Sequence, residues 1–364
     1  MSKNLFIAAT GQSDGKTTTS IGLFDVFREN KFKVGFIKPV GQRYINVGND
    51  QIDKDSYLIE QIFQSKCNIR DMSPIAIPSG YTTQYIENRH DLKEELRDRL
   101  DYSFKCISEK NDLVIVEGTG HAGVGSVLDL SNAKVASLTH SKVIIIAPGG
   151  IGYTVDEVML NKALFDKENV EILGVIVNKV IEDKYEKTKK LVTQALSYQN
   201  IPVLGCIPYR ASLSSPNMAL IQENLKQATC LNQCSTSYKN INKIVVAAMT
   251  PKHVVDHLVK GSLLIVPGDR HTVIEAVISA SACIPEKHVR GIILTGGILP
   301  RKKTLDMLTT HDIPILSVPF ETYETSKLVS KLLVKITHND VNKIQLAKEL
   351  IREFVDTDSI LERL

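Results

Sequence analysis

The chain has 364 residues, which is the usual length of two domains. Its 44 Lys and Arg residues nearly balance 41 Asp and Glu residues, and the net charge of +3 lies in no basic or acidic block. This balance argues against a nucleic-acid partner. Charged residues at 23% and hydrophobic residues at 43% exclude a disordered chain and a disulfide-built scaffold.

The cysteines and the apolar segments indicate the cellular compartment. The six cysteines are scattered, and the one close pair, Cys230 and Cys234, has no second pair or nearby His to complete a zinc site. No apolar run reaches the roughly 18 residues that a membrane span needs, and the apolar run near the N-terminus is too short for a signal peptide. The sequence therefore predicts a cytoplasmic protein with no membrane partner.

Short apolar segments alternate with helix-length segments through the first 215 residues. An apolar run at 5–9 precedes a glycine-containing loop and a helix that begins near residue 16. Further buried strands are expected at 34–37, 113–116, 143–147, 172–177 and 203–207. Continuously apolar strands that alternate with helices predict an α/β fold, with a parallel sheet covered on both faces.

The alternation weakens over 216–242, where polar residues accumulate and a linker is expected. A smaller α/β set then follows, with strands at 243–248, 262–266, 291–294 and 313–317. Helices are expected near 253–259, 272–282, 302–310, 322–335 and 341–354. The predicted domains are thus 1–215 and 243–335, and a helical segment at 336–364 completes the chain.

One loop carries the strongest chemical signal, the sequence Thr10-Gly11-Gln12-Ser13-Asp14-Gly15-Lys16-Thr17 between the first strand and the first helix. Loop N–H groups and the positive end of a helix converge there on a site for phosphate. Lys16 is expected to reach the β- and γ-phosphates, and the Thr17 hydroxyl to hold Mg²⁺. Thr10 stands where the standard spacing has glycine, and a plain helix-capping turn is the alternative.

Charged residues also follow the next strands at the same edge of the sheet. Lys38 ends the second strand and would offset phosphate charge, although a solvated lysine is an equal alternative. Glu117 ends the strand at 113–116, before Gly118-Thr119-Gly120. Mg²⁺ prefers carboxylate and hydroxyl oxygens, so Thr17, Glu117 and either Asp53 or Asp55 form a sensible metal shell.

Weaker candidates lie at later strand ends. Asn178 and Pro208 could flank a purine base, although ordinary turn chemistry accounts for them equally well. In the second half, two polar turns could form an anion or small-ligand pocket, or could be turns and nothing more. The residues of this possible pocket are Asp269, Arg270, Thr295, Gly296 and Gly297.

Taken together, these motifs resemble the dethiobiotin synthetase-like P-loop family. The carrying segments are the loop at 10–17, Lys38-Pro39-Val40, Glu117-Gly118-Thr119-Gly120, Asn178-Lys179 and Leu204-Gly205-Cys206-Ile207-Pro208. The segments Gly268-Asp269-Arg270 and Thr295-Gly296-Gly297 resemble the signature of the DRTGG domain. The pairing is similar to the N-terminal regulatory half of long bacterial phosphotransacetylases and to free-standing proteins of that layout, over roughly residues 3–335.

The resemblance implies roles for individual residues. It implies ATP and Mg²⁺ as cofactors, Lys16 and Lys38 on the phosphates as catalytic groups, and Asp55 rather than Asp53 beside Thr17 and Glu117 at the metal. It implies nucleotide-binding positions at Gly11, Asp14, Gly15, Lys16, Thr17, Thr18, Asn178 and Pro208. His121 stands where the biotin-pathway enzymes usually have glycine, which argues against their organic substrate.

Three functions are consistent with these features. The leading one is a nucleotide-binding regulatory or sensor protein whose DRTGG-like domain binds a metabolite, with no acetyltransferase activity of its own. The second is an ATP-dependent ligase that activates a carboxylate or carbamate, or a slow ATPase. The third is a scaffold that has lost its ligand, against which Lys16 and Thr17 argue. Expected partners are a nucleotide, a small metabolite, enzymes of acetate and acetyl phosphate metabolism, and a second copy of the chain.

Overall fold

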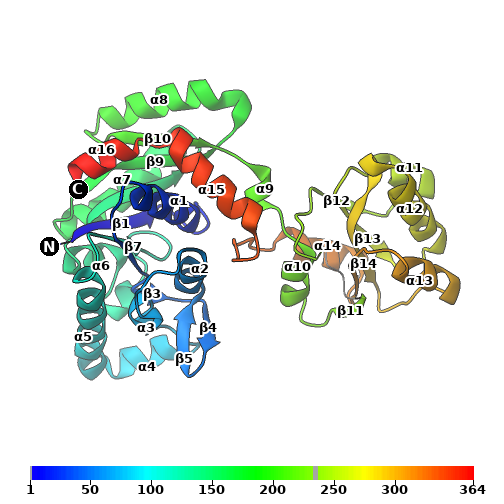
Figure 1. Ribbon diagram of the computed structural model, residues 1–364, viewed down its shortest axis with the longest axis horizontal. Helices are drawn as coiled ribbons and strands as arrows, with labels where there is room; N and C mark the ends of the chain where they lie inside the picture. Colours follow the sequence, from blue (N-terminus) through cyan, green and yellow to red (C-terminus); the bar gives the residue numbers. More distant parts are fainter. Residues whose placement is uncertain (1, 233–236) are drawn as a thin grey trace. The chain divides into compact units, whose positions relative to one another are not determined.

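The computed structural model describes residues 2–232 and 237–364, so Cys234 lies outside the described residues (Figure 1). The chain divides into two compact units. Unit 1 consists of Met1–Tyr209 and Val341–Leu364, and unit 2 consists of Arg210–Asp340. None of the helices in the described ranges combines the length and the apolar composition that crossing a bilayer requires.

Unit 1 is built on a six-stranded parallel sheet in the order β10-β9-β8-β1-β7-β2, which confirms the predicted α/β class. Every residue of β2 and β7 is buried, because helices cover both faces of the sheet. The strands are β1 (Lys3–Ala9), β2 (Val34–Ile37), β7 (Leu113–Glu117), β8 (Lys142–Pro148), β9 (Ile172–Val180) and β10 (Val203–Pro208).

Most crossover segments between these strands are helical. The long helices are α1 (Lys16–Glu29), α2 (Lys54–Phe63), α5 (Arg89–Ser108), α7 (Gly152–Lys167) and α8 (Tyr185–Ser197), and the short ones are α3 (Ile69–Met72), α4 (Tyr81–Glu87) and α6 (Asn132–Leu138). The segment after β2 also contains an antiparallel hairpin of β4 (Tyr44–Val47) and β5 (Asp50–Asp53), and a parallel pair of β3 (Val40–Gly41) and β6 (Ile75–Ala76). The sequence analysis predicted neither pair.

The end of the chain returns to unit 1. Helix α15 (Val341–Phe354) packs along α1, as Figure 1 shows for the orange-red and dark blue helices. Gly22 permits the close approach, because a Cβ there would lie 2.2 Å from Cγ1 of Ile351. Arg352 donates to Glu29 at 2.6 Å, and α16 (Thr357–Arg363) contacts β10. The segment predicted as separate at 336–364 is therefore, from Val341 onward, part of unit 1.

Unit 2 has a five-stranded sheet in the order β11-β15-β14-β13-β12, parallel except for the edge strand β11. Its strands are β11 (Thr229–Asn232), β12 (Lys243–Val246), β13 (Ser262–Pro267), β14 (Val289–Thr295) and β15 (Ile315–Ser317). Its helices are α9 (Ala211–Ser214), α10 (Met218–Asn224), α11 (Pro251–His257), α12 (His271–Cys283), α13 (Lys302–Thr309) and α14 (Thr322–Ser330).

The described parts of the segment expected as a linker, 216–232 and 237–242, belong to unit 2. Met218 and Ile221 of α10 are buried against Leu263 and Ile265 of the sheet, and β11 pairs with β15. Neither element has a clear sequence signal, because α10 is short and β11 is a partly exposed edge strand rich in polar residues.

Candidate functional site

Three neighbouring strands bring the predicted phosphate-binding residues together. In the order β1-β7-β2, the carboxyl ends of all three strands meet at one edge of the sheet. The glycine loop follows β1, Glu117 ends β7, and Lys38 follows β2 directly. Open α/β sheets bind ligands at this edge, so the topology itself assembles the candidate site.

The glycine loop wraps around the Lys16 ammonium group. Gly15 caps α1 with a φ of 107°, a left-handed conformation that favours glycine. Lys16 is only 8% exposed, and its Nζ donates to the carbonyl oxygens of Gly11 and Gly120, each at 3.1 Å. The lysine therefore lies inside the loop, bonded to backbone oxygens rather than to a carboxylate.

Glu117 lies at the centre of a buried polar cluster. Its carboxylate, which is fully buried, accepts from Thr17 Oγ1 at 3.1 Å, from Ser20 Oγ at 2.7 Å and from Lys38 Nζ at 2.9 Å. Lys38 also forms an ion pair with Asp55. The structure thus brings Thr17, Lys38, Asp55 and Glu117 together through hydrogen bonds and ion pairs.

The pKa values of Lys16 and Lys38 are shifted in opposite directions. Burial, and then the nearby charge of Lys38, lower the pKa of Lys16 from 10.5 to about 8. Burial alone would also lower the pKa of Lys38, but the carboxylates of Asp55 and Glu117 raise it well above its ordinary value. Lys38 therefore stays charged and neutralises the two carboxylates, whereas an anion that binds near Lys16 would stabilise its charged form.

Asp53 and Asp55 have different positions. Asp53 caps α2, and its Oδ1 accepts from the backbone N of Asp55 at 2.8 Å. Asp55 is the second residue of α2 and forms an ion pair with Lys38. This ion pair joins Asp55 to the cluster around Glu117, and its role as a metal ligand stays a prediction.

The Asn178 side chain is hydrogen-bonded to the glycine loop and does not point into open space. Its Nδ2 donates to the carbonyl oxygen of Asp14 at 2.7 Å, and its Oδ1 accepts from the backbone N of Lys179. A Cβ on Gly15 would lie 2.1 Å from this Nδ2, so the loop and the amide fit only with glycine there. Pro208 pairs in register with Val180 on the next strand. The expected contact of Asn178 and Pro208 with a base stays a prediction.

The remaining loop residues support the bend. Thr10 Oγ1 donates to Asp14 Oδ2 at 3.0 Å, so the residue at the non-consensus position bridges the loop. A Cβ on Gly11 would lie 3.1 Å from the same Asp14 oxygen. Thr18 is half-buried on the first turn of α1.

The candidate pocket residues of unit 2 form hydrogen bonds within the protein. Arg270 donates to the carbonyl oxygen of Met249 at 2.8 Å, and Thr295 shares a hydrogen bond with Thr322. The N–H groups of Gly296 and Gly297 donate to carbonyl oxygens of Phe320 and Val318. Asp269 accepts through its carbonyl oxygen from the N–H of His271. Most of these contacts tie the two turns to segments more than 20 residues away in the chain, and ligand binding there stays a prediction.

Two site residues escaped the sequence analysis. Ser20 lies one helical turn after Thr17, so both hydroxyls face Glu117, and the i, i+3 spacing was the available signal. Asn132 braces the Glu117 turn, with its Oδ1 accepting from Thr119 N and its Nδ2 donating to the carbonyls of Thr119 and His121. It lies 13 residues from Thr119, and no local pattern connects the two positions.

Comparison with known families agrees with this geometry. The family AAA_26, described as an AAA domain, matches residues 3–217, more than half of the chain. The chain belongs to this family. The DRTGG domain matches residues 221–332, so an AAA domain is followed by a DRTGG domain, and the predicted resemblance is confirmed.

Among characterised proteins, this AAA–DRTGG chain is similar to phosphate acetyltransferases. It is 27% identical over 376 residues to that of Pseudomonas putida, with 99% of this chain and 52% of the relative covered. It is 25% identical over 382 residues to that of Nitratidesulfovibrio vulgaris, with 100% and 52% covered. The chain therefore spans about half the length of the curated relatives it matches.

One similar solved structure is the septum site-determining protein MinD of Pyrococcus horikoshii complexed with Mg-ADP. It is 15% identical in sequence, and the match has a TM-score of 0.37 and covers 58% of this chain and 84% of that one. The CBS and DRTGG domains of Clostridium perfringens pyrophosphatase, complexed with diadenosine tetraphosphate, are 16% identical, with a TM-score of 0.28, covering 57% and 86%. Likenesses at these TM-scores establish neither a shared fold nor a shared ligand.

Proposed function

We propose that the AAA domain binds a nucleoside triphosphate, ATP in the first instance, at the carboxyl edge of β1, β7 and β2. The observation that carries the proposal is the buried Lys16 ammonium. It donates to the carbonyl oxygens of Gly11 in the loop and Gly120 after β7, beside the cluster of Lys38, Asp55 and Glu117. A polyphosphate would offset the cost of burying Lys16, and the loop N–H groups at the α1 N-terminus would bind its oxygens.

The donor set also fits Mg²⁺. Thr17, Asp55 and Glu117 supply one hydroxyl and two carboxylates, the hard oxygen ligands that this ion prefers together with phosphate oxygens and water. Within the described residues, no group of three or more His, Cys, Asp and Glu side chains could hold a metal without such partners. We therefore propose that the ion enters with the nucleotide.

We further propose a regulatory role. The AAA and DRTGG domains stand together in a chain similar to phosphate acetyltransferases and spanning about half their length. A nucleotide that binds one conformation better than another shifts their populations, with coupling typically of about 1–3 kcal/mol. Enzymes of acetate and acetyl phosphate metabolism are the proposed partners, the cytoplasm the proposed location, and self-association the proposed assembly.

A thermal unfolding series tests nucleotide binding directly. ATP with Mg²⁺ at 100 times its Kd is expected to stabilise the chain by about 2.7 kcal/mol, raising Tm by several degrees. AMP, which lacks the β- and γ-phosphates, serves as the matched ligand control. An unchanged Tm at millimolar ATP or GTP with Mg²⁺ contradicts the proposal.

Nucleotide binding is expected to take up a proton above pH 8. Because the pKa of Lys16 is about 8 in the folded protein and 10.5 when unperturbed, the unfolded state binds more protons between these values. The stability of the free protein therefore rises with pH across this window. A bound triphosphate restores the charge on Lys16, so the affinity of the protein for the triphosphate falls as the pH rises above 8. Titration calorimetry at pH 9 in two buffers of different ionisation enthalpy measures the uptake.

This pH effect has clear controls. At pH 6.5 Lys16 is already charged, so uptake assigned to it should vanish. In a Lys16→Met variant, the rise in the free energy of unfolding between pH 8 and 10.5 should be smaller, because the contribution of Lys16 is gone. Proton uptake at pH 9 that persists in this variant would assign the proton to another group.

A ligase remains the second candidate because Lys38 supplies a second buried cation near Lys16. Two lysines and Mg²⁺ are sufficient to position and neutralise a transferred phosphoryl group. ADP release that requires an added carboxylic acid would favour the ligase. Slow ADP release at the same rate with and without the carboxylic acid would favour the regulatory protein.

A further inference from the structure

Unit 1 contains a pocket that no residue of the glycine loop lines. Its volume is about 710 Å³, within the usual range of about 300–1,000 Å³ for small-molecule sites. The β4–β5 hairpin forms one wall, and α3, α4, α5 and the segment around β6 form the others. None of the predicted phosphate or metal ligands lines it, and we call it the hairpin pocket.

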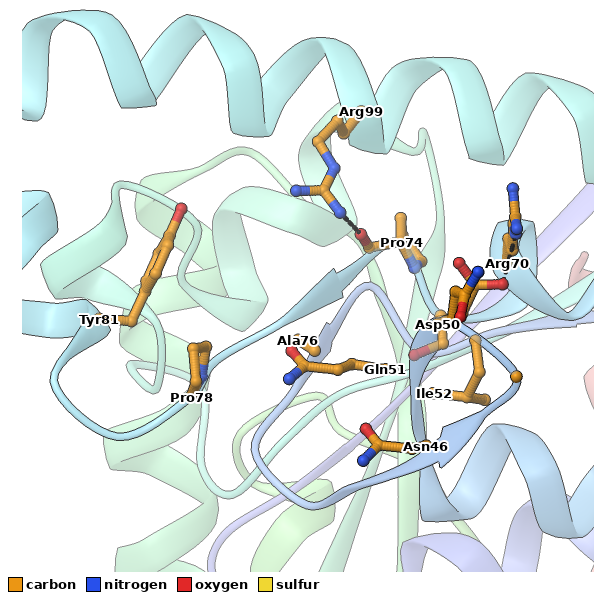
Figure 2. A pocket seen from close by; sticks show the side chains of 13 residues that line it. Asn46, Asp50, Gln51, Ile52, Arg70, Pro74, Ala76, Pro78, Tyr81 and Arg99 are labelled. Carbon is orange, nitrogen blue, oxygen red and sulfur yellow. Dashed lines mark hydrogen bonds and ion pairs between the residues drawn. The ribbon is translucent and has the colours of Figure 1, made fainter.

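The hairpin presents two amides to this pocket. Asn46 and Gln51 are directly opposite each other in the antiparallel register, so their side chains lie on the same face of the hairpin. Both are exposed and line the pocket, and Figure 2 shows Gln51 extending from β5 toward Ala76. An amide pair of this kind can donate to oxygen atoms of a ligand.

Two guanidinium groups stand at the same pocket, each held by one bond. Arg99 reaches from α5 and donates through Nη2 to the carbonyl oxygen of Pro74 at 2.7 Å (Figure 2). Arg70 donates through Nε to Asp50 at 2.5 Å. Each guanidinium has five N–H donors, so most remain available for a ligand.

The remaining polar groups also suit an anion. Burial, with Glu95 nearby, raises the pKa of Tyr81, so this phenol remains a donor at neutral pH. Asp50 is the only carboxylate among the described lining residues, and Arg70 neutralises it. Arg99 faces Glu95 more loosely, at 3.8 Å. The lining thus offers guanidinium, amide and phenol donors and one carboxylate that is already paired.

We propose that the hairpin pocket binds a small organic anion whose acidic groups, carboxylate or phosphate, pair with Arg70 and Arg99 at their separate positions on the wall, and whose other oxygens accept from lining donors such as Gln51 and Tyr81. Planar guanidinium groups bind both kinds of anion in a bidentate manner. The proposal does not depend on nucleotide binding.

The pocket wall continues into the nucleotide site. Ser73 lines the pocket, and its Oγ accepts from the backbone N of Asp53 at 2.8 Å. Asp53 in turn caps α2, which carries Asp55 to Lys38. The ligand is therefore one that can act as an effector, because it binds the strand whose end positions Asp55.

Calorimetric titration of the full chain with 3-phosphoglycerate, citrate and inorganic phosphate tests the proposal, with glycerol as the neutral control. At least one organic anion is expected to bind. The double variant Arg70→Gln/Arg99→Gln should weaken this binding about tenfold or more, because two charge-assisted contacts are lost. Binding of phosphate alone assigns the recognised group to the phosphate, and binding of citrate assigns it to the carboxylate.

Arg97→Gln is the matched control, because Arg97 is an exposed arginine on the same helix that does not line the pocket. Its affinity for the anion should equal that of the original chain. Should the double variant fail to fold by circular dichroism, Arg70→Gln alone replaces it, since that side chain is 65% exposed.

Several results would overturn the proposal. They are no binding of any anion at 10 millimolar, undiminished binding in the double variant, or an equal loss in Arg97→Gln. A Lys16→Ala variant separates the two sites. If it alone loses the anion, the anion occupies the glycine loop, so the hairpin proposal fails while nucleotide binding stands. If it keeps the anion but loses ATP, both proposals stand.

Discussion

Replacing Lys38 by methionine is expected to lower the free energy of unfolding by about 3–5 kcal/mol at neutral pH. The variant leaves Asp55 and Glu117 buried without the cation that pairs with both. Because the pKa of Lys38 is raised above its ordinary value, its contribution is complete below about pH 10.5 and is lost only as the pH rises through the folded value. Urea unfolding at pH 7 measures the difference.

Lys33→Met is the control for Lys38, because Lys33 is exposed and lies just before β2, at the opposite end of that strand. It should change stability by less than about 0.5 kcal/mol. Adding Glu117→Gln to Lys38→Met should recover part of the loss, because one buried charge is removed. A loss below 1 kcal/mol in Lys38→Met would contradict the proposed electrostatic role.

Replacing Lys16 by alanine is expected to weaken ATP·Mg²⁺ binding by one to two decades. The variant removes a charged hydrogen bond to phosphate, worth about 1.5–3 kcal/mol. Its stability without nucleotide should hold, since burial lowers the pKa of Lys16 to about 8 and the charged lysine is itself costly there. Titration calorimetry at pH 7 measures the affinity, and Tm without ligand checks the fold.

Lys33→Ala is the matched control for this second variant, since it removes an exposed lysine far from the glycine loop along β2. It should bind ATP·Mg²⁺ like the original chain. Equal affinities in Lys16→Ala and Lys33→Ala would remove Lys16 from the phosphate site. Weaker binding in both would point to a general charge effect.

The central strands and the cluster of Thr17, Lys38, Asp55 and Glu117 were predictable because their signals are local. Strands such as Val34–Ile37 are continuously apolar, which a sheet buried on both faces requires. Charged residues at the ends of such strands must then meet at one edge, and Lys38 and Glu117 do so at 2.9 Å. The contacts of Asn178 with the loop were not predictable, because they depend on the angle of one amide.

The hairpin was missed although a signal existed. Tyr44–Val47 and Asp50–Asp53 flank Gly48 and Asn49, a two-residue connection of the kind that favours tight hairpins. A search for continuous apolar runs overlooks short strands with one polar face. Without the hairpin, the pocket beside Arg70 and Arg99 was also out of reach, since its walls come from five separate elements.

The return of α15 to unit 1 could not be derived from its own pattern. Its amphipathic sequence requires a partner but does not identify one. The partner is α1, more than 300 residues earlier, and Gly22 contacts Ile351 only through tertiary packing.

The discontinuity of unit 1 has a consequence for synthesis on the ribosome. The surfaces of α1 and of the outer strand β10 that α15 and α16 contact stay uncovered until Val341–Leu364 has left the exit tunnel. Unit 2, one uninterrupted segment, has all its residues available earlier and can complete its fold first. The nascent chain therefore carries an uncovered apolar surface while unit 2 emerges, and chaperone binding to ribosome-bound chains should be strongest in that interval.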